Sequence, residues 1–162
     1  VCVTGGEPLL YPSVGDFLAR IREMGYLVKL DTNGTLPECL APLLAASCVD
    51  YVAMDVKSSP AGYRKAVGVA VDTDKIMQSL SLIRNSGIAH EFRTTVVKGI
   101  HTEEDVVEMA KLVGDSPYFL QGFIDSGDLI DGGALSAFTK EEMTAMRDKA
   151  RQFAPQCELR GV

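Results

Sequence analysis

Four short segments of this sequence end in residues that could bind a small polar molecule. The first is Thr4-Gly5-Gly6-Glu7-Pro8, which follows the apolar residues Val1 and Val3. Two adjacent glycines let a ligand approach the backbone closely, and Pro8 prevents further strand pairing. Glu7 is therefore expected in a ligand-facing loop at the carboxyl end of a buried strand. The alternative is an ordinary turn, since paired glycines are common in turns.

Polar side chains recur two residues apart in the other three segments, and alternation along a strand places both members of each pair on one face. The pairs are Lys29 with Asp31, Asp55 with Lys57, and Arg93 with Thr95, and Gln121 is expected on the same face. Buried ions are costly unless they are paired or liganded. The set therefore predicts a polar cavity for a zwitterionic or anionic small molecule. The alternative is a network in which these charges neutralise one another without a ligand.

The elements that must position these residues alternate between strand and helix. Strands are expected over residues 1–3, 26–31, 49–57, 91–98 and 118–123, with a short last strand at 157–161. Helices are expected over residues 14–24, 37–48, 73–87, 103–113 and 140–153. Residues 58–71 are expected to form a connection without regular secondary structure. The last two helices follow sequences that resemble capping boxes, Thr102 with Asp105 and Thr139 with Glu142. This order predicts an α/β fold with a parallel sheet, as one domain over residues 1–162, whose functional face is the carboxyl end of the strands.

Composition favours a globular protein and argues against several functions. No apolar run in this sequence is long enough to span a membrane, and no basic segment is followed by the apolar stretch typical of a secretory signal. The net charge of −6 argues against a nucleic-acid-binding face, which is normally basic. No Cys-x-x-Cys spacing occurs, so Cys2, Cys39 and Cys48 are expected to be small buried side chains of a cytoplasmic protein.

The four segments, in this order, resemble those of radical S-adenosylmethionine (SAM) enzymes that activate glycyl-radical proteins. The resemblance covers most of the chain and rests on Thr4 to Pro8, Leu30 to Gly34, Met54 to Lys57, and Arg93 to Gly99. The runs at residues 28–34, 50–57 and 91–97 are most similar to anaerobic ribonucleoside-triphosphate reductase activating proteins. The resemblance implies a partial (βα) TIM-like barrel of parallel strands that lacks its first βα unit.

The resemblance also implies roles for individual residues in binding SAM. Gly5, Gly6 and Glu7 would hold the amino group of its methionine part. Lys57 would pair with the SAM carboxylate, and Arg93 would support the same end of the cofactor.

Similarity to pyruvate formate-lyase activating enzyme implies a second binding site beside the first. Asp31, Thr32 and Asp55, with the Ala53 carbonyl, would hold a monovalent cation. Oxygen ligands of this kind suit a hard cation.

One motif of the family, the Cys-x-x-x-Cys-x-x-Cys sequence that binds a [4Fe-4S] cluster, does not occur in this sequence. The chain is therefore interpreted as a fragment whose cluster motif lies upstream of Val1, and the fragment alone is expected to be inactive. The complete protein would cleave SAM reductively and form a glycyl radical on anaerobic ribonucleotide reductase or a pyruvate formate-lyase type partner, with an electron donor such as flavodoxin. The fragment is expected to self-associate through the edge of its first strand.

Two other functions remain open, and two further features have no assigned role. The chain could belong to a radical SAM enzyme that acts on a small molecule, or it could be a non-catalytic α/β nucleotide-binding module. His101 is expected to be a solvated loop residue, although it could touch a ligand. The loop from Asp125 to Gly133 is expected to be a flexible surface loop, with partner contact or cover of the cavity as the alternative.

Overall fold

The computed structural model describes residues 1–125 and 135–162. These residues form two compact units, which are described separately. Unit 1 comprises Val1–Asp55 and Asp72–Glu91, and unit 2 comprises Val56–Val71 and Phe92–Val162. Apart from Asp125, the predicted loop from Asp125 to Gly133 lies outside the described residues.

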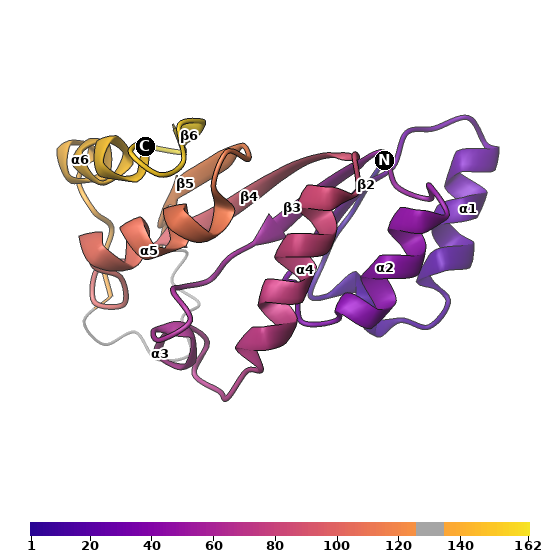
Figure 1. The fold of residues 1–162 in the computed structure, drawn as a ribbon, viewed down its shortest axis with the longest axis horizontal. Helices are drawn as coiled ribbons and strands as arrows, with labels where there is room; N and C mark the ends of the chain where they lie inside the picture. Colours follow the sequence, from indigo (N-terminus) through magenta and orange to yellow (C-terminus); the bar gives the residue numbers. More distant parts are fainter. Residues whose placement is uncertain (126–134) are drawn as a thin grey trace. The chain divides into compact units, whose positions relative to one another are not determined.

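Unit 1 contains parallel strands and the helices that follow them in the chain (Figure 1). Its elements are β1 (Cys2–Val3), η1 (Pro8–Leu10), α1 (Val14–Glu23), β2 (Lys29–Thr32), α2 (Pro37–Ala45), β3 (Tyr51–Asp55) and α4 (Thr73–Asn85). The register pairs Cys2 with Lys29 and Lys29 with Tyr51, so these three residues form one row across the strands. Helices α2 and α4 lie side by side.

The strands of unit 1 bury one face and leave the other partly open. Leu30 on β2 and Val52 and Met54 on β3 are completely buried. Lys29 and Asp31, on either side of Leu30, are only partly buried. This alternation was the basis for placing the paired charges on one face, and it is confirmed for β2. Burial of the apolar row supplies the hydrophobic stabilisation that holds the strands under the helices.

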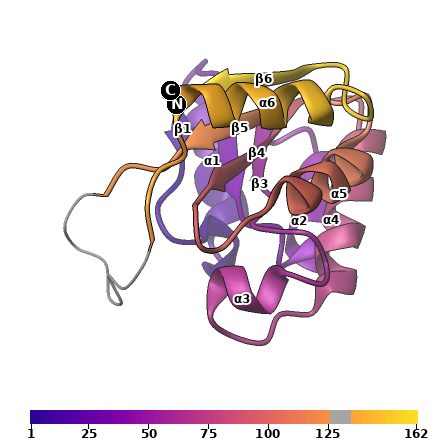
Figure 2. The ribbon, with the colours of Figure 1, turned by 90° about the vertical axis from the view of Figure 1, so that its left-hand side faces the viewer.

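Unit 2 contains the second group of parallel strands. Its elements are α3 (Tyr63–Val67), most of β4 (Ala89–Val96, which begins in unit 1), α5 (Glu103–Val113), β5 (Tyr118–Gly122), α6 (Lys140–Ala150) and β6 (Cys157–Arg160). Phe92, Tyr118 and Cys157 form one fully buried row across β4, β5 and β6. Helix α6 packs against α5 and β6 (Figure 2).

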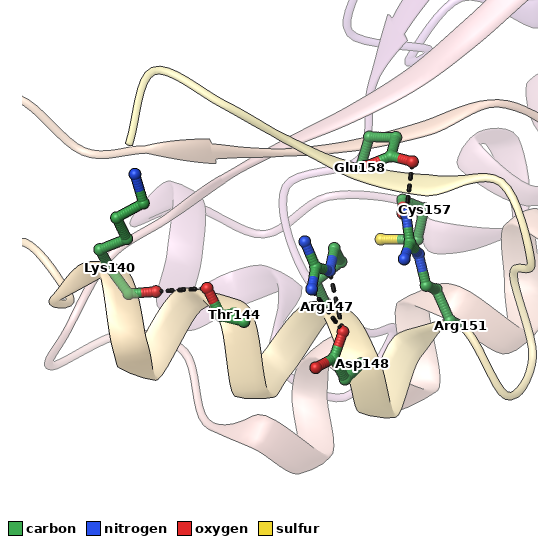
Figure 3. A network of polar contacts seen from close by, with 7 residues as sticks. All are labelled: Lys140, Thr144, Arg147, Asp148, Arg151, Cys157 and Glu158. Atoms are coloured by element: carbon green, nitrogen blue, oxygen red, sulfur yellow. Dashed lines mark hydrogen bonds and ion pairs between the residues drawn. The ribbon is translucent and has the colours of Figure 1, made fainter.

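The last strand is held to α6 by Arg151, which follows the helix directly. Its Nε donates a hydrogen bond to the Cys157 carbonyl oxygen at 2.8 Å, and its guanidinium forms an ion pair with Glu158 (Figure 3). Together with the pairing of β6 to β5, these contacts hold the last strand in place.

The predicted α/β class with a parallel sheet is confirmed, and the order of the strands follows the chain from β1 to β6. The five predicted helices and both capping boxes are confirmed. The short last strand is also present, as β6. Strand β1 pairs with β2, and self-association through β1 stays a prediction. Among the described residues, every helix is too short or too polar to cross a membrane.

Several boundaries differ from the prediction. Strand β3 is Tyr51–Asp55 rather than 49–57, so Lys57 lies beyond it, and β4 is Ala89–Val96 rather than 91–98. Strand β2 begins at Lys29 rather than at residue 26, because the Tyr26 amide donates to the Ile21 carbonyl oxygen at the end of α1 instead of pairing with a strand. The predicted connection at residues 58–71 contains α3, which the sequence did not indicate. A helix of five residues is too short to display an apolar period, although it buries Tyr63 almost completely.

Candidate functional site

The glycine loop after β1 presents bare backbone to its surroundings. Gly5 has a φ of +99° and Gly6 a φ of +58°, a region that favours glycine over residues with a side chain. A Cβ atom added at either position would meet no other atom within 4 Å. Both glycines are exposed, so the main-chain groups of the loop are accessible to a ligand.

The Glu7 side chain is buried, with 6% of its surface exposed, and it accepts several hydrogen bonds from within unit 1. The Thr32 hydroxyl lies 3.0 and 3.1 Å from its two carboxylate oxygens, the Asn33 amide donates to Oε2 at 2.6 Å, and the Leu9 amide donates to Oε1 at 3.1 Å. Glu7 thus ties the glycine loop to the turn after β2. The sequence analysis missed this role, for which the donor-rich turn of Thr32 and Asn33 was the available signal. Contact between Glu7 and a SAM amino group stays a prediction.

Charged and polar side chains of β2, β3 and the start of β4 form a network in unit 1. Lys29 Nζ lies 2.9 Å from Asp31 Oδ1 and 4.0 Å from Glu91 Oε1, and the Tyr51 hydroxyl donates to Glu91 Oε2 at 3.1 Å. Glu91 is only 5% exposed, so these contacts compensate the cost of burying its charge. For these residues, the alternative of mutual neutralisation is supported.

The three side chains assigned to a monovalent cation lie at the ends of β2 and β3. Asp31 is paired with Lys29, and the Thr32 hydroxyl donates to Glu7 and accepts from the Gly34 amide at 3.1 Å. Asp55 is the last residue of β3 and is partly buried. Within the described ranges, no group of three His, Cys, Asp or Glu residues gathers around one point. The cation site stays a prediction.

The described cysteines do not fit a [4Fe-4S] cluster, which requires three thiolates close together, because no three His, Cys, Asp or Glu side chains gather within the described part of the chain. Cys2 is exposed, Cys39 and Cys48 are partly buried, and Cys157 is buried. The prediction that Cys2 is buried was wrong, because Cys2 stands in the same row as Lys29, on the open face of the strands. Its Sγ lies 3.7 Å from Asp31 Oδ1.

In unit 2, Lys57 and Arg93 come from neighbouring stretches of backbone. The Val56 amide donates to the Arg93 carbonyl oxygen at 2.8 Å, so Lys57 directly follows a residue bound to the β4 main chain. Lys57 lies two residues beyond the end of β3, and both Lys57 and Arg93 are partly buried. The two cationic residues predicted for the SAM carboxylate are therefore placed close together in the fold of unit 2.

The main chain of Lys57 is held on both sides by side chains of unit 2. The Lys57 amide donates to the Tyr63 hydroxyl oxygen at 3.2 Å, and the Lys57 carbonyl oxygen lies 2.8 Å from His101 Nε2. His101 Nδ1 accepts a hydrogen bond from the Val97 amide at 3.0 Å, which leaves Nε2 as the nitrogen that carries the proton. His101 is 6% exposed, so the expectation of a solvated loop residue was wrong.

The first turn of α5 is linked to the segment that follows Lys57. Ser59 Oγ donates to Asp105 Oδ1 at 2.8 Å, and the Thr102 amide donates to Asp105 Oδ2 at 3.1 Å. Burial alone would raise the pKa of the Asp105 carboxyl, but the hydrogen bonds from Ser59 and Thr102 outweigh it and lower that pKa. The ionised carboxylate therefore stabilises this part of unit 2.

Comparison with known proteins identifies the family. The model of the Radical SAM superfamily matches residues 1–113. A candidate glycyl-radical enzyme activating enzyme of Methanocaldococcus jannaschii is 36% identical over 129 residues, which cover 76% of this chain and 54% of that protein. An S-adenosyl-L-methionine-dependent tRNA 4-demethylwyosine synthase of Pyrococcus abyssi is 30% identical over 119 residues, which cover 67% of this chain and 32% of that protein. The chain thus spans between about a third and about a half of these relatives.

A solved structure supports the same fold over the whole length of the chain. A domain of pyruvate-formate lyase-activating enzyme from Bacteroides vulgatus superposes with a TM-score of 0.78, covering 99% of this chain and 98% of that domain at 16% identity. The expected partial barrel of parallel strands is thereby confirmed as the fold class. With the family match over residues 1–113, these comparisons show that the chain belongs to the radical SAM superfamily.

Proposed function

We propose that this chain forms most of the radical SAM core of an enzyme that activates a glycyl-radical protein, and that its strand ends bind SAM. The observation that carries the proposal is the glycine loop after β1, where Gly5 and Gly6 expose their main chain and the buried Glu7 carboxylate ties the loop to Thr32 and Asn33 at the end of β2. Similarity to a candidate activating enzyme, at 36% identity, favours this function over others in the superfamily.

In this proposal, the chain contributes binding and orientation of SAM. The main-chain groups of Gly5 and Gly6 receive the amino group of the methionine part, with Glu7 at the base of the loop. Lys57 forms an ion pair with the SAM carboxylate, and Arg93 adds positive charge at the same end. Charge-assisted hydrogen bonds of this kind are stronger than neutral ones and fix the direction of the ligand.

We propose that the redox part of the reaction depends on groups outside the described residues. A [4Fe-4S] cluster, when bound, supplies the electron for reductive cleavage of SAM, and the described cysteines do not fit such a cluster. We propose that its ligands belong to a segment of the protein beyond this chain. The chain alone is accordingly proposed to be inactive.

The proposed substrate is a glycine residue of anaerobic ribonucleotide reductase or of a related glycyl-radical enzyme. The runs at residues 28–34, 50–57 and 91–97 support this choice by their resemblance to reductase activating proteins. A second candidate is a radical SAM enzyme with a different substrate, which the similarity to a tRNA-modifying synthase favours.

Binding of SAM is tested with the complete protein that carries this chain, reconstituted with iron and sulfide without oxygen. Lys57→Ala should weaken SAM affinity, measured by calorimetry, by about tenfold, because a charged hydrogen bond to the carboxylate is lost. Lys111→Ala is the matched control, since Lys111 lies on α5 and pairs with Glu108 on the exposed surface. Unchanged affinity in Lys57→Ala would contradict the role proposed for Lys57.

The reaction is tested with the same preparation, a reductant and a candidate partner enzyme. We expect 5′-deoxyadenosine to form and a glycyl radical to be detected by electron paramagnetic resonance on the partner. Deoxyadenosine without a radical on the partner would favour the second candidate. A protein that binds nucleotides but never cleaves SAM would instead be a non-catalytic module.

A further inference from the structure

The residue proposed to bind the SAM carboxylate, Lys57, lies in a stretch without regular secondary structure. It follows the end of β3 and precedes α3, and the residue before it, Val56, still donates a hydrogen bond to the β4 main chain. A long lysine side chain on an unrestrained backbone would pay a large entropic cost on binding a ligand. The contacts that hold this segment therefore bear on how well Lys57 could bind a ligand.

Side chains from two different segments of unit 2 bind the Lys57 peptide groups. His101 Nε2 donates to the Lys57 carbonyl oxygen at 2.8 Å, and the Tyr63 hydroxyl oxygen accepts from the Lys57 amide at 3.2 Å. His101 is 6% exposed and Tyr63 is 3% exposed, so water competes little with either hydrogen bond. Both main-chain polar atoms of Lys57 are thus bound by buried side chains.

The imidazole of His101 is itself fixed in position and in tautomer. Its Nδ1 accepts from the Val97 amide at 3.0 Å, and the His101 amide donates to the Val97 carbonyl oxygen at 2.9 Å. The turn after β4 therefore orients the ring so that Nε2–H points at Lys57. A hydrogen bond from a neighbouring group commonly sets the tautomer of a functional histidine in this way.

Helix α3, which carries Tyr63, is also held by a hydrogen bond to the turn after β4. Tyr63 opens α3, and Lys65 of the same helix donates from Nζ to the Ile100 carbonyl oxygen at 3.0 Å, one residue before His101. The segment around Lys57, helix α3 and the turn after β4 are thus connected within unit 2 by three hydrogen bonds. Loss of any one of these hydrogen bonds should therefore affect all three segments.

We propose that His101, assisted by Tyr63, is a positioning residue for SAM binding, which acts by fixing the main chain of Lys57 through Nε2–H. This inference rests on the proposed role of Lys57. His101 does not need to touch SAM. It sets where the Lys57 side chain starts, and in enzymes a misplacement of about 1 Å can cost about 100-fold in rate.

Two substitutions distinguish the role of His101 Nδ1 as an acceptor from the role of Nε2 as a donor. Asparagine places an oxygen near the Nδ1 position, so His101→Asn keeps the acceptor for the Val97 amide and loses the donor to Lys57. Glutamine places an NH₂ group near the Nε2 position, so His101→Gln keeps the donor to Lys57. In the complete reconstituted protein we expect His101→Asn to weaken SAM binding about tenfold and His101→Gln to stay within about twofold of the natural protein.

The decisive measurement is a double-mutant cycle with Lys57→Ala, in which SAM affinity is measured by calorimetry. If His101 acts through Lys57, His101→Asn should have little further effect once Lys57 is alanine. An additive effect, or equal losses in His101→Asn and His101→Gln, would overturn the inference while leaving the role of Lys57 intact. Unchanged SAM affinity in Lys57→Ala alone would refute the proposed role of Lys57, and the inference would fall with it.

A milder variant covers the case in which His101→Asn does not fold. Tyr63→Phe removes only the hydroxyl that accepts from the Lys57 amide and keeps the buried ring. It should weaken SAM binding by a smaller factor, about threefold, and this loss should also disappear in the Lys57→Ala background. A loss that persists in that background would overturn the inference.

Discussion

The Thr32 hydroxyl lies 3.0 Å and 3.1 Å from the two carboxylate oxygens of Glu7, 25 residues earlier in the chain. This contact joins the loop after β1 to the end of β2, and the Asn33 amide strengthens it with a hydrogen bond of 2.6 Å. The carboxylate of the glycine motif is thereby part of the fold of unit 1. Its conservative replacement should be measurable as a loss of stability as well as a loss of ligand binding.

Glu7→Gln should lower the free energy of unfolding by about 1–3 kcal/mol, because the amide NH₂ group would face a donor and leave a buried N–H without an acceptor. Urea unfolding followed by circular dichroism measures this change. Glu38→Gln is the control, since Glu38 is an exposed glutamate on α2 that pairs with Lys75. The two variants should differ clearly, and equal midpoints would contradict a structural role for Glu7.

Gly34→Ala should be more destabilising than Gly25→Ala, although both glycines have positive φ, +77° and +84°. A Cβ at Gly34 would lie 2.1 Å from Met54 Cε, whereas a Cβ at Gly25 would meet nothing within 4 Å. Backbone strain should cost about 1 kcal/mol in both variants, and the clash should add about 1–3 kcal/mol in Gly34→Ala. Unfolding midpoints in urea compare the two, and identical values would show that Met54 moves away freely.

Asp105 should stabilise the protein in a pH-dependent way. Its pKa in the folded protein lies below the ordinary value of 3.8, since the hydrogen bonds from Ser59 and Thr102 outweigh burial. The stabilisation is therefore present above pH 3.8 and is lost as the pH falls through the folded pKa. The difference in unfolding free energy between the natural chain and Asp105→Asn should shrink as the pH is lowered from about 7 to about 3. A difference that does not vary with pH would contradict this assignment.

The cysteines should differ strongly in their reaction with iodoacetamide. Cys2 is exposed, whereas Cys157 is completely buried, and burial raises the pKa of its thiol to about 12. Because the thiolate is the reactive form, native protein at about pH 8 should be labelled at Cys2 and not at Cys157. Peptide mass spectrometry measures the labelling, with urea-unfolded protein as the control in which both react. Early labelling of Cys157 would show that β6 opens from α6.

The sequence by itself determined the class of fold and most of its elements. Apolar periodicity predicted the positions of the helices. The capping boxes at Thr102 and Thr139 indicated two helix starts, which the structure confirms. These features are local, since a capping box satisfies backbone groups within one turn of helix. The resemblance of four segments in order indicated the radical SAM superfamily, which the comparisons confirm.

Only the tertiary structure decided which side chains hold the candidate site together. Glu7 contacts Thr32 and Asn33 across 25 and 26 residues of sequence, and His101 contacts Lys57 across 44. Such contacts depend on how separate segments are placed in space, and neither residue type nor spacing along the chain encodes that placement. For the same reason His101 was expected in solvent, although the fold buries it and assigns the direction of its proton.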